Sequence, residues 1–229
     1  MSDAPTRATA QVLALLDDAA SGAALLELAS PLARMLKREL SVIYVESSRS
    51  LVAAALPITR VLAHSRLQWM PLSPGDVEQG FRAHQARLRQ LTARVALRDA
   101  LQWSLRVVRG NLGETAEQLR AESDLLLLAH APPPGPRTAY GAQLPRRRLL
   151  VVTVGESDGA GQRALQVATR LARVVEGVVQ IAHIDRSGRN PEPPGLLDAL
   201  GQCDLLVLPH ATLDPVAMAL LPCPVLLVG

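Results

Sequence analysis

The stretches ESDLLLLAHA at residues 122–131 and QCDLLVLPHA at residues 202–211 share one pattern. Each has an aspartate, then a run of leucine and valine, and one residue later a histidine followed by an alanine. Such a run is typical of a buried strand, and a pattern kept in phase over this distance indicates an internal repeat. A true repeat requires the sequence around the two stretches to correspond as well.

The segments that open each half of the chain do correspond. In the first half, VLALL at 12–16 and LSVIYVE at 40–46 are apolar runs typical of buried parallel strands. Between them, apolar residues recur at the three- and four-residue spacing of an amphipathic helix. In the second half, RLLVVTV at 148–154 and VVQIAHI at 178–184 flank a similar helical segment. Strand, helix and strand in this order predict an α/β protein with a parallel sheet.

The two halves differ beyond this shared opening. Residues 47–75 contain three prolines and are predicted to form a helical excursion over the edge of the sheet. A helix at 76–99, a strand at 103–110 and a short helix at 113–121 then lead to the first quoted stretch. The second half passes to a short helix at 195–202 and then to the second quoted stretch. Each half therefore keeps a different part of a common pattern.

A turn-rich stretch, PPPGPRTAYGAQLP at 132–145, separates the halves. We predict a first domain at 1–131 that lacks its final helix and strand, a linker rich in proline and arginine at 132–147, and a shortened second domain at 148–229.

Composition excludes several classes of protein. The chain is 48% hydrophobic and 20% charged, as expected of a globular protein. No apolar run reaches the ~18 residues that span a membrane, and the polar start carries no secretory signal, so no membrane partner and a cytoplasmic location are expected. The net charge is +3, but the basic residues are scattered and aromatic residues are only 2%, which argues against nucleic-acid binding.

The two cysteines, Cys203 and Cys223, are too few for a disulfide framework. They precede strands that should be neighbours and could approach each other. A disulfide needs specific side-chain directions, however, and cytoplasmic proteins rarely keep one, so packed thiols are the preferred interpretation.

The chain resembles a tandem member of the universal stress protein family. The resemblance rests on residues 14–46 and 107–131 of the first half, and on residues 151–185, 203–211 and 222–229 of the second. It implies two α/β sandwiches like those of the adenine nucleotide alpha hydrolases, each complete copy having a five-stranded parallel sheet in the order 3-2-1-4-5. Ligands of such sheets bind beyond the carboxyl ends of the strands, where the strand order reverses.

In this family, ATP-binding members have an aspartate after strand 1 and a glycine-rich segment after strand 4 whose backbone N–H groups hold the phosphates. The first copy keeps the aspartate as Asp17, but Gly135 and Gly141 are wrongly spaced among prolines, which donate no N–H. The second copy has Gly155 at the aspartate position and no glycine in residues 209–218. No cofactor is therefore expected. A residual pocket at the strand ends would use Asp17, Tyr44, His130, Gly155 and His210.

A metal site is an alternative to a nucleotide pocket at these strand ends. His183, Asp185 and His210 end strands of the second copy, and Glu46 joins the candidates of the first. Strands 2 and 4 are separated by strand 1, which would put His183 and His210 ~10 Å apart, too far to share an ion. No metal is expected.

The missing final strand of the first copy would leave an LLLL run on a bare edge. Residues 225–228 are the only spare strand, and strand 5 commonly lies at the dimer contact in the family that the chain resembles. We predict an intramolecular pseudo-dimer of the two halves through this strand. A homodimer through the same C-terminal strand and a protein partner of unknown identity are further expectations.

The predicted function is that of a non-catalytic stress-response protein with a degenerate nucleotide site, which acts through a partner or a small molecule. The first alternative is an ATP- or AMP-binding stress protein, with weak ATPase activity left open, that holds the phosphates through other donors such as Arg137 or residues 146–148. The second is a metal-binding module.

Overall fold

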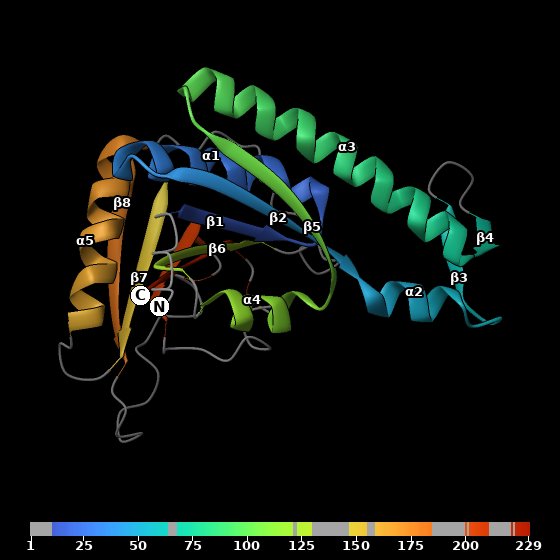
Figure 1. The fold of residues 1–229 in the computed structure, drawn as a ribbon. Helices are drawn as coiled ribbons and strands as arrows, with labels where there is room; N and C mark the ends of the chain where they lie inside the picture. The colour runs from blue at the N-terminus through green and yellow to red at the C-terminus, as the bar shows by residue number, and fades with distance from the viewer. Residues whose placement is uncertain are drawn as a thin grey trace, which may run out of the picture.

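A computed structural model of the chain describes residues 11–63, 68–120, 123–129, 147–154, 159–184, 200, 202–210, 221 and 223–229. Within these residues the main sheet has eight strands in the order β5-β2-β1-β6-β10-β9-β7-β8, and helices cover both of its faces (Figure 1). The α/β class predicted from the sequence is confirmed. None of the helices that the structure describes is long and apolar enough to cross a membrane.

The strands of the main sheet coincide with the apolar runs of the sequence. Their bounds are β1 Gln11–Leu16, β2 Glu39–Ser47, β5 Trp103–Gly110, β6 Leu125–Ala129, β7 Arg148–Val154, β8 Val178–Ile184, β9 Leu205–Pro209 and β10 Val225–Val228. A separate two-stranded sheet contains β3 Arg60–Ala63 and β4 Gln68–Pro71. The helices are α1 Ala19–Leu36, α2 Ser48–Ala54, α3 Pro74–Asp99, α4 Leu112–Arg120 and α5 Gly159–Val174. The predicted helix at 195–202 lies almost entirely outside the described residues.

Two groups of parallel strands meet at one antiparallel pair. The first strand group is β5, β2, β1 and β6, and the second is β10, β9, β7 and β8. Between them, β10 runs antiparallel to β6, with Val225 opposite Leu128 and Val228 opposite Leu125. The carboxyl ends of the first group therefore lie at one margin of the sheet, the first rim, and those of the second group at the opposite margin, the second rim.

Strand β10 has no free edge. It pairs with β6 on one side and with β9 on the other. The expected homodimer through this strand is therefore wrong as a strand pairing, because both rows of its backbone hydrogen-bonding groups are already used within the chain.

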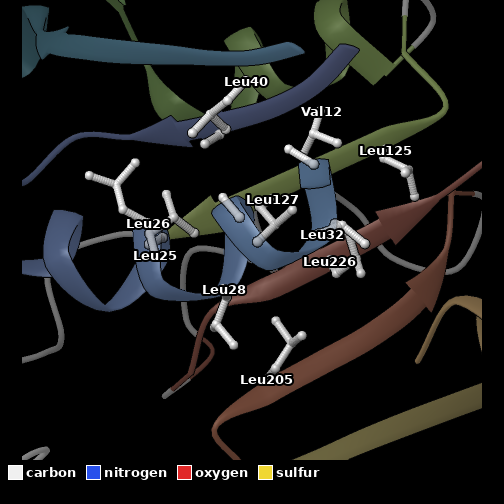
Figure 2. Close-up of a cluster of buried hydrophobic side chains, with 14 of the residues drawn as sticks. Val12, Leu25, Leu26, Leu28, Leu32, Leu40, Leu125, Leu127, Leu205 and Leu226 are labelled. Carbon is white, nitrogen blue, oxygen red and sulfur yellow. The ribbon is translucent and has the colours of Figure 1, made fainter. Parts of the chain in front are cut away.

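Helix α1 covers the junction of the two strand groups. Its N-cap is Asp18, whose side chain accepts a hydrogen bond from the Ser21 N–H, and Lys37 ends it in the left-handed conformation. Leucines recurring along the helix face the sheet, and Figure 2 shows them over Leu127 of β6, Leu226 of β10 and Leu205 of β9. Helix α5 packs on the same face, whereas α4 lies on the opposite face of the sheet (Figure 1).

Helix α3 packs on α1 and extends beyond the sheet to the β3–β4 hairpin (Figure 1). It starts with a capping box between Ser73 and Asp76. Gly22 of α1 allows the close approach, because a Cβ there would stand 2.5 Å from Cδ2 of Leu88. The excursion at 47–75 is predicted to be helical, but among its described residues the helix before α3 covers Ser48–Ala54 alone. Beyond it Pro57 and the β-branched residues after it oppose a helix, and the chain forms the hairpin instead.

Replacing Leu226 by alanine tests the role of the central strand. Leu226 is fully buried between β6 and β9, so Leu226→Ala should lower the free energy of unfolding by about 2–5 kcal/mol in urea titrations. The matched control is Leu97→Ala on α3, where the side chain is 85% exposed and the change should stay within about 0.5 kcal/mol. Equal effects of the two substitutions would contradict the central position of β10.

Candidate functional site

A cluster of polar side chains lies at the first rim, where β2 ends beneath α3. We call it the Tyr44 cluster, and its members are Tyr44, Glu46, His84, Gln85 and Arg109. The hydroxyl of Tyr44, a residue with no exposed surface, lies 3.2 Å from Nδ1 of His84. The strand β2 brings Tyr44 to this place and α3 brings His84, so the contact joins the sheet to the helix above it.

Glu46 forms the centre of the cluster and is only 8% exposed. Its Oε1 accepts a hydrogen bond of 2.7 Å from Nε2 of Gln85. Its Oε2 accepts two from Arg109, at 3.3 Å from Nε and 3.1 Å from Nη2. Arg109 reaches it because the two residues are register partners on the parallel strands β2 and β5. Both oxygens of this buried carboxylate are therefore bonded within the protein, as a buried charge requires.

Burial raises the pKa of Tyr44 well above its ordinary value, and the nearby carboxylates of Glu46, Asp18 and Asp17 raise it further. Phe81 packs edge-on against the Tyr44 ring, with 6.4 Å between ring centroids, and adds to the apolar surroundings. The phenol consequently stays protonated at neutral pH and cannot act as a base there.

Two aspartates follow β1 at the same rim. Asp18 is the N-cap of α1 and accepts hydrogen bonds from the N–H and hydroxyl groups of Ser21, at 3.2 Å and 3.4 Å. Asp17, the aspartate that the family resemblance singles out, is half-buried and close enough to Tyr44 to raise the pKa of that phenol. The structure thus brings Asp17, Tyr44 and Glu46 to one rim.

A second cluster lies at the opposite rim, around the end of β9. We call it the His210 cluster, with members His210, Arg120, Asp124, Arg163 and Gly229. Nη1 of Arg120 donates to the His210 carbonyl and Nε of Arg163 to the Gly229 carbonyl, both at 2.9 Å. The Gly229 N–H donates to the Asp124 carbonyl at 2.9 Å. These bonds tie the end of β9 to α4, and the end of β10 to α5 and to the residue before β6.

The imidazole of His210 packs against Gly229, where a Cβ would stand 3.1 Å from the ring. Burial, followed by the charge of Arg120, lowers the pKa of His210, while Asp124 opposes this shift. Its Nε2 is buried and has no hydrogen-bond partner among the described residues. The ring is therefore neutral at pH 7 and contributes no charge to this rim.

The candidates from the sequence divide between the rims. Asp17 and Tyr44 lie at the first rim and His210 at the second, whereas His130, Gly155 and Asp185 lie outside the described residues. The backbone of His183 belongs to β8, and β7 separates that strand from β9, which His210 follows. In the part of the chain that the structure describes, no group of three metal-binding side chains comes together.

Three members of the Tyr44 cluster were not predicted: His84, Gln85 and Arg109. In the sequence, His84 and Gln85 look like ordinary polar residues of a helix. The local sequence does not indicate that α3 crosses β2 at this point. The sequence did contain a signal for Arg109, because both Arg109 and Glu46 lie near the carboxyl ends of predicted parallel strands, which share one edge of a sheet. The missing information was that the two strands are neighbours, together with their register.

No family model matches this chain, and no curated protein matches it either. Among solved structures, it is similar to a universal stress protein from Archaeoglobus fulgidus DSM 4304 at 11% identity, over 94% of this chain and 95% of that one, with a TM-score of 0.43. It is also similar to a universal stress protein solved in complex with cAMP, at 17% identity, over 76% of this chain and 98% of that one, with a TM-score of 0.28.

The raised pKa of Tyr44 predicts a specific loss of stability in alkali. The unfolded phenol loses its proton above a pKa of about 10 while the folded one keeps it, so this contribution is present below pH 10 and lost as the pH rises further. Between pH 9 and 11 the wild type should lose about 1 kcal/mol more unfolding free energy than Tyr44→Phe. Urea titrations of both proteins at the two pH values measure this, and equal losses would mean that Tyr44 ionises freely in the folded state.

Proposed function

We propose that this protein is a non-catalytic protein of the universal stress type, whose nucleotide edge has been converted into a closed structural network and which works through protein contacts. The observation that carries the proposal is the pairing within the Tyr44 cluster. Glu46 is bonded by Gln85 and Arg109, and the Tyr44 hydroxyl lies against His84. A ligand that bound through Glu46 would have to break bonds that this buried carboxylate needs, at a cost of several kcal/mol.

The proposal includes two degenerate copies, at 1–131 and 148–229, joined by a linker at 132–147. Its support is that all the strands of each group come from one of these segments. In this interpretation β10 completes both copies of an intramolecular pseudo-dimer, as the fifth strand of its own copy and as a substitute for the strand that the first copy lacks. A cytoplasmic location belongs to the same proposal.

The sequence also argues against the family's phosphate contacts. The segment after β9 has no glycine in residues 209–218, and the glycines after β6 are wrongly spaced. The alternative function, ATP or AMP binding through other donors, would use arginines such as Arg148. That residue's Nη1 already donates to Oε1 of Gln202 at 2.6 Å, and its backbone N–H to Asp204. A metal-binding module remains the second alternative through His183, Asp185 and His210.

Calorimetric titration of ATP, ADP, AMP and cyclic AMP into the purified protein tests the proposal. We expect no binding tighter than about 1 mM for any of them, and no release of phosphate from ATP in the same samples. Micromolar binding would contradict the proposal. Its loss in Asp17→Asn but not in Arg148→Gln would then place the nucleotide beside Asp17 rather than beside Arg148. Zinc bound in stoichiometric amount to the purified protein would contradict it in favour of the metal alternative.

Protein contacts have a candidate surface on the excursion that precedes α3. We call it the excursion surface, and it consists of the exposed apolar side chains of Val52, Leu56, Ile58, Val61, Leu62, Trp69 and Met70. Ile58 is 84% and Trp69 63% exposed. Single exposed apolar residues are ordinary, but this number within one short stretch of the chain favours an interaction site.

The partner proposed for the excursion surface is a second copy of this chain. Within the described residues, β3 pairs only with β4, so each strand of the hairpin keeps one edge without a strand partner. A two-stranded hairpin of this length is marginal in water and gains stability from further strands. Two hairpins related by a twofold axis present the same surface to each other, which gives a closed dimer.

Sedimentation equilibrium tests this contact. The wild type should be dimeric at tens of micromolar protein, and Ile58→Glu should be monomeric because the carboxylate would be buried in the interface. Leu97→Glu is the matched control, since Leu97 is 85% exposed on α3, away from the hairpin, and this variant should stay dimeric. A monomeric wild type would rule out the second copy as the partner.

A further inference from the structure

The two cysteines of the chain lie side by side beneath the sheet. Their Sγ atoms are 3.1 Å apart, and the residues are 6% and 8% exposed. Both are free thiols. They belong to the buried cluster on the face of the sheet opposite α1, together with Leu206, Leu208 and Val225.

The fold fixes this proximity through the backbone. Cys203 and Cys223 precede β9 and β10, which are parallel neighbours with Leu206 opposite Val225. The Leu206 N–H donates to the Pro224 carbonyl at 2.9 Å, so the two strands are paired within a few residues of both cysteines. The backbone N–H of Arg148 donates to Asp204 at 2.7 Å and anchors the residue that follows Cys203. The thiols are thus held together by sheet pairing.

We propose that Cys203 and Cys223 form a reversible disulfide site whose oxidant is a small peroxide. Two buried thiols held within contact distance need only a small movement to reach the S–S bond length of about 2.05 Å. A peroxide is the class of oxidant that suits residues with so little exposed surface, because it is not much larger than water. Disulfides that sense oxidants in this way are an exception to the reduced state of cytoplasmic thiols.

The chemistry balances in two steps. The Cys203 thiolate attacks one oxygen of hydrogen peroxide, the O–O bond breaks, and the sulfur is oxidised to a sulfenic acid while the departing hydroxide takes up a proton to become water. The Cys223 sulfur then attacks the Cys203 sulfur, the S–O bond breaks, and the hydroxyl leaves with the Cys223 proton as a second water. Two thiols lose two electrons and two protons, and the peroxide is reduced to two waters.

The two cysteines have different roles in this scheme. Either sulfur can donate the hydrogen bond between them, and Cys203 can also donate to the Leu200 carbonyl at 3.4 Å. When the Cys223 thiol is the donor, the bond lowers the pKa of Cys203, against the effect of burial. Donating that bond, together with burial, raises the pKa of Cys223. Since the thiolate is the nucleophile, we assign the reaction with the oxidant to Cys203 and the resolving step to Cys223, and single variants test this assignment.

Oxidation would act on the centre of the sheet. The bond closes the loop between the start of β9 and the start of β10, and β10 is the strand that pairs with β6. Closing a loop of this size restricts the unfolded chain and stabilises the fold. Peroxide therefore fixes β10 to β9, its parallel neighbour within the second strand group.

The test uses the wild-type chain treated with hydrogen peroxide under native conditions, then unfolded and alkylated with N-ethylmaleimide. We expect a loss of both alkylatable thiols, a mass lower by two hydrogen atoms, one peptide linking Cys203 to Cys223, and recovery of both thiols with dithiothreitol. The midpoint of thermal unfolding should rise by roughly 5–10 °C. Because this experiment needs no substitution, it does not depend on how well a variant folds.

Single variants test the assignment of roles. In Cys223→Ala, Cys203 should form a sulfenic acid that dimedone traps, whereas in Cys203→Ala the thiol of Cys223 should remain alkylatable. Alanine suits these positions because a buried cysteine behaves as a small apolar residue. Two thiols that remain alkylatable in the treated wild type, or a disulfide that joins two chains, would overturn the proposal. Equal oxidation of the two variants would overturn the assignment of roles.

Discussion

The fold depends on the antiparallel pairing of β10 with β6. Both strands are short runs of leucine and valine buried on both faces, and without β10 the backbone groups of β6 would stand on a free edge. Strand β10 gives its other edge to β9, so four residues hold two groups of parallel strands in one sheet. Helix α1 covers this junction, which makes the core on that face continuous from one group to the other.

The same reversal of direction separates the polar residues that end the strands. Strand ends of the first group gather at one rim and those of the second group at the other, so the Tyr44 and His210 clusters do not form one site. The polar groups near the core are hydrogen-bonded in a different way at each rim. At the first, the Glu46 carboxylate is bonded by Arg109 and Gln85, and at the second, Arg120 and Arg163 bond the carbonyls that end β9 and the chain segment after β10. In both arrangements the polar side chains form hydrogen bonds with other groups of the protein itself.

The strands and the long helices were predictable because their signals are local. Apolar runs such as 125–128 and 205–208 correspond to β6 and β9, and the spacing of apolar residues anticipates α1 and α3. The pair of Glu46 with Arg109 was not predictable, because it depends on which strands are neighbours and on their register. Likewise His84 reaches Tyr44 only through the angle at which α3 crosses the sheet. The hairpin was missed because its strands are four residues long and lack the turn sequences that identify hairpins.

The central pairing also determines the order of events in folding. Strands β6 and β10 are about 100 residues apart in the chain, and contacts between such distant segments form slowly because a long loop must close first. Local units such as β1, α1 and β2 can assemble early, but the leucines of β6 keep an unpaired edge until residues 225–228 have been made and have paired with them. During this interval the unpaired edge of β6 can pair with other chains. Aggregation therefore competes with folding until β10 has paired with β6, and chaperones that cover the edge would favour folding.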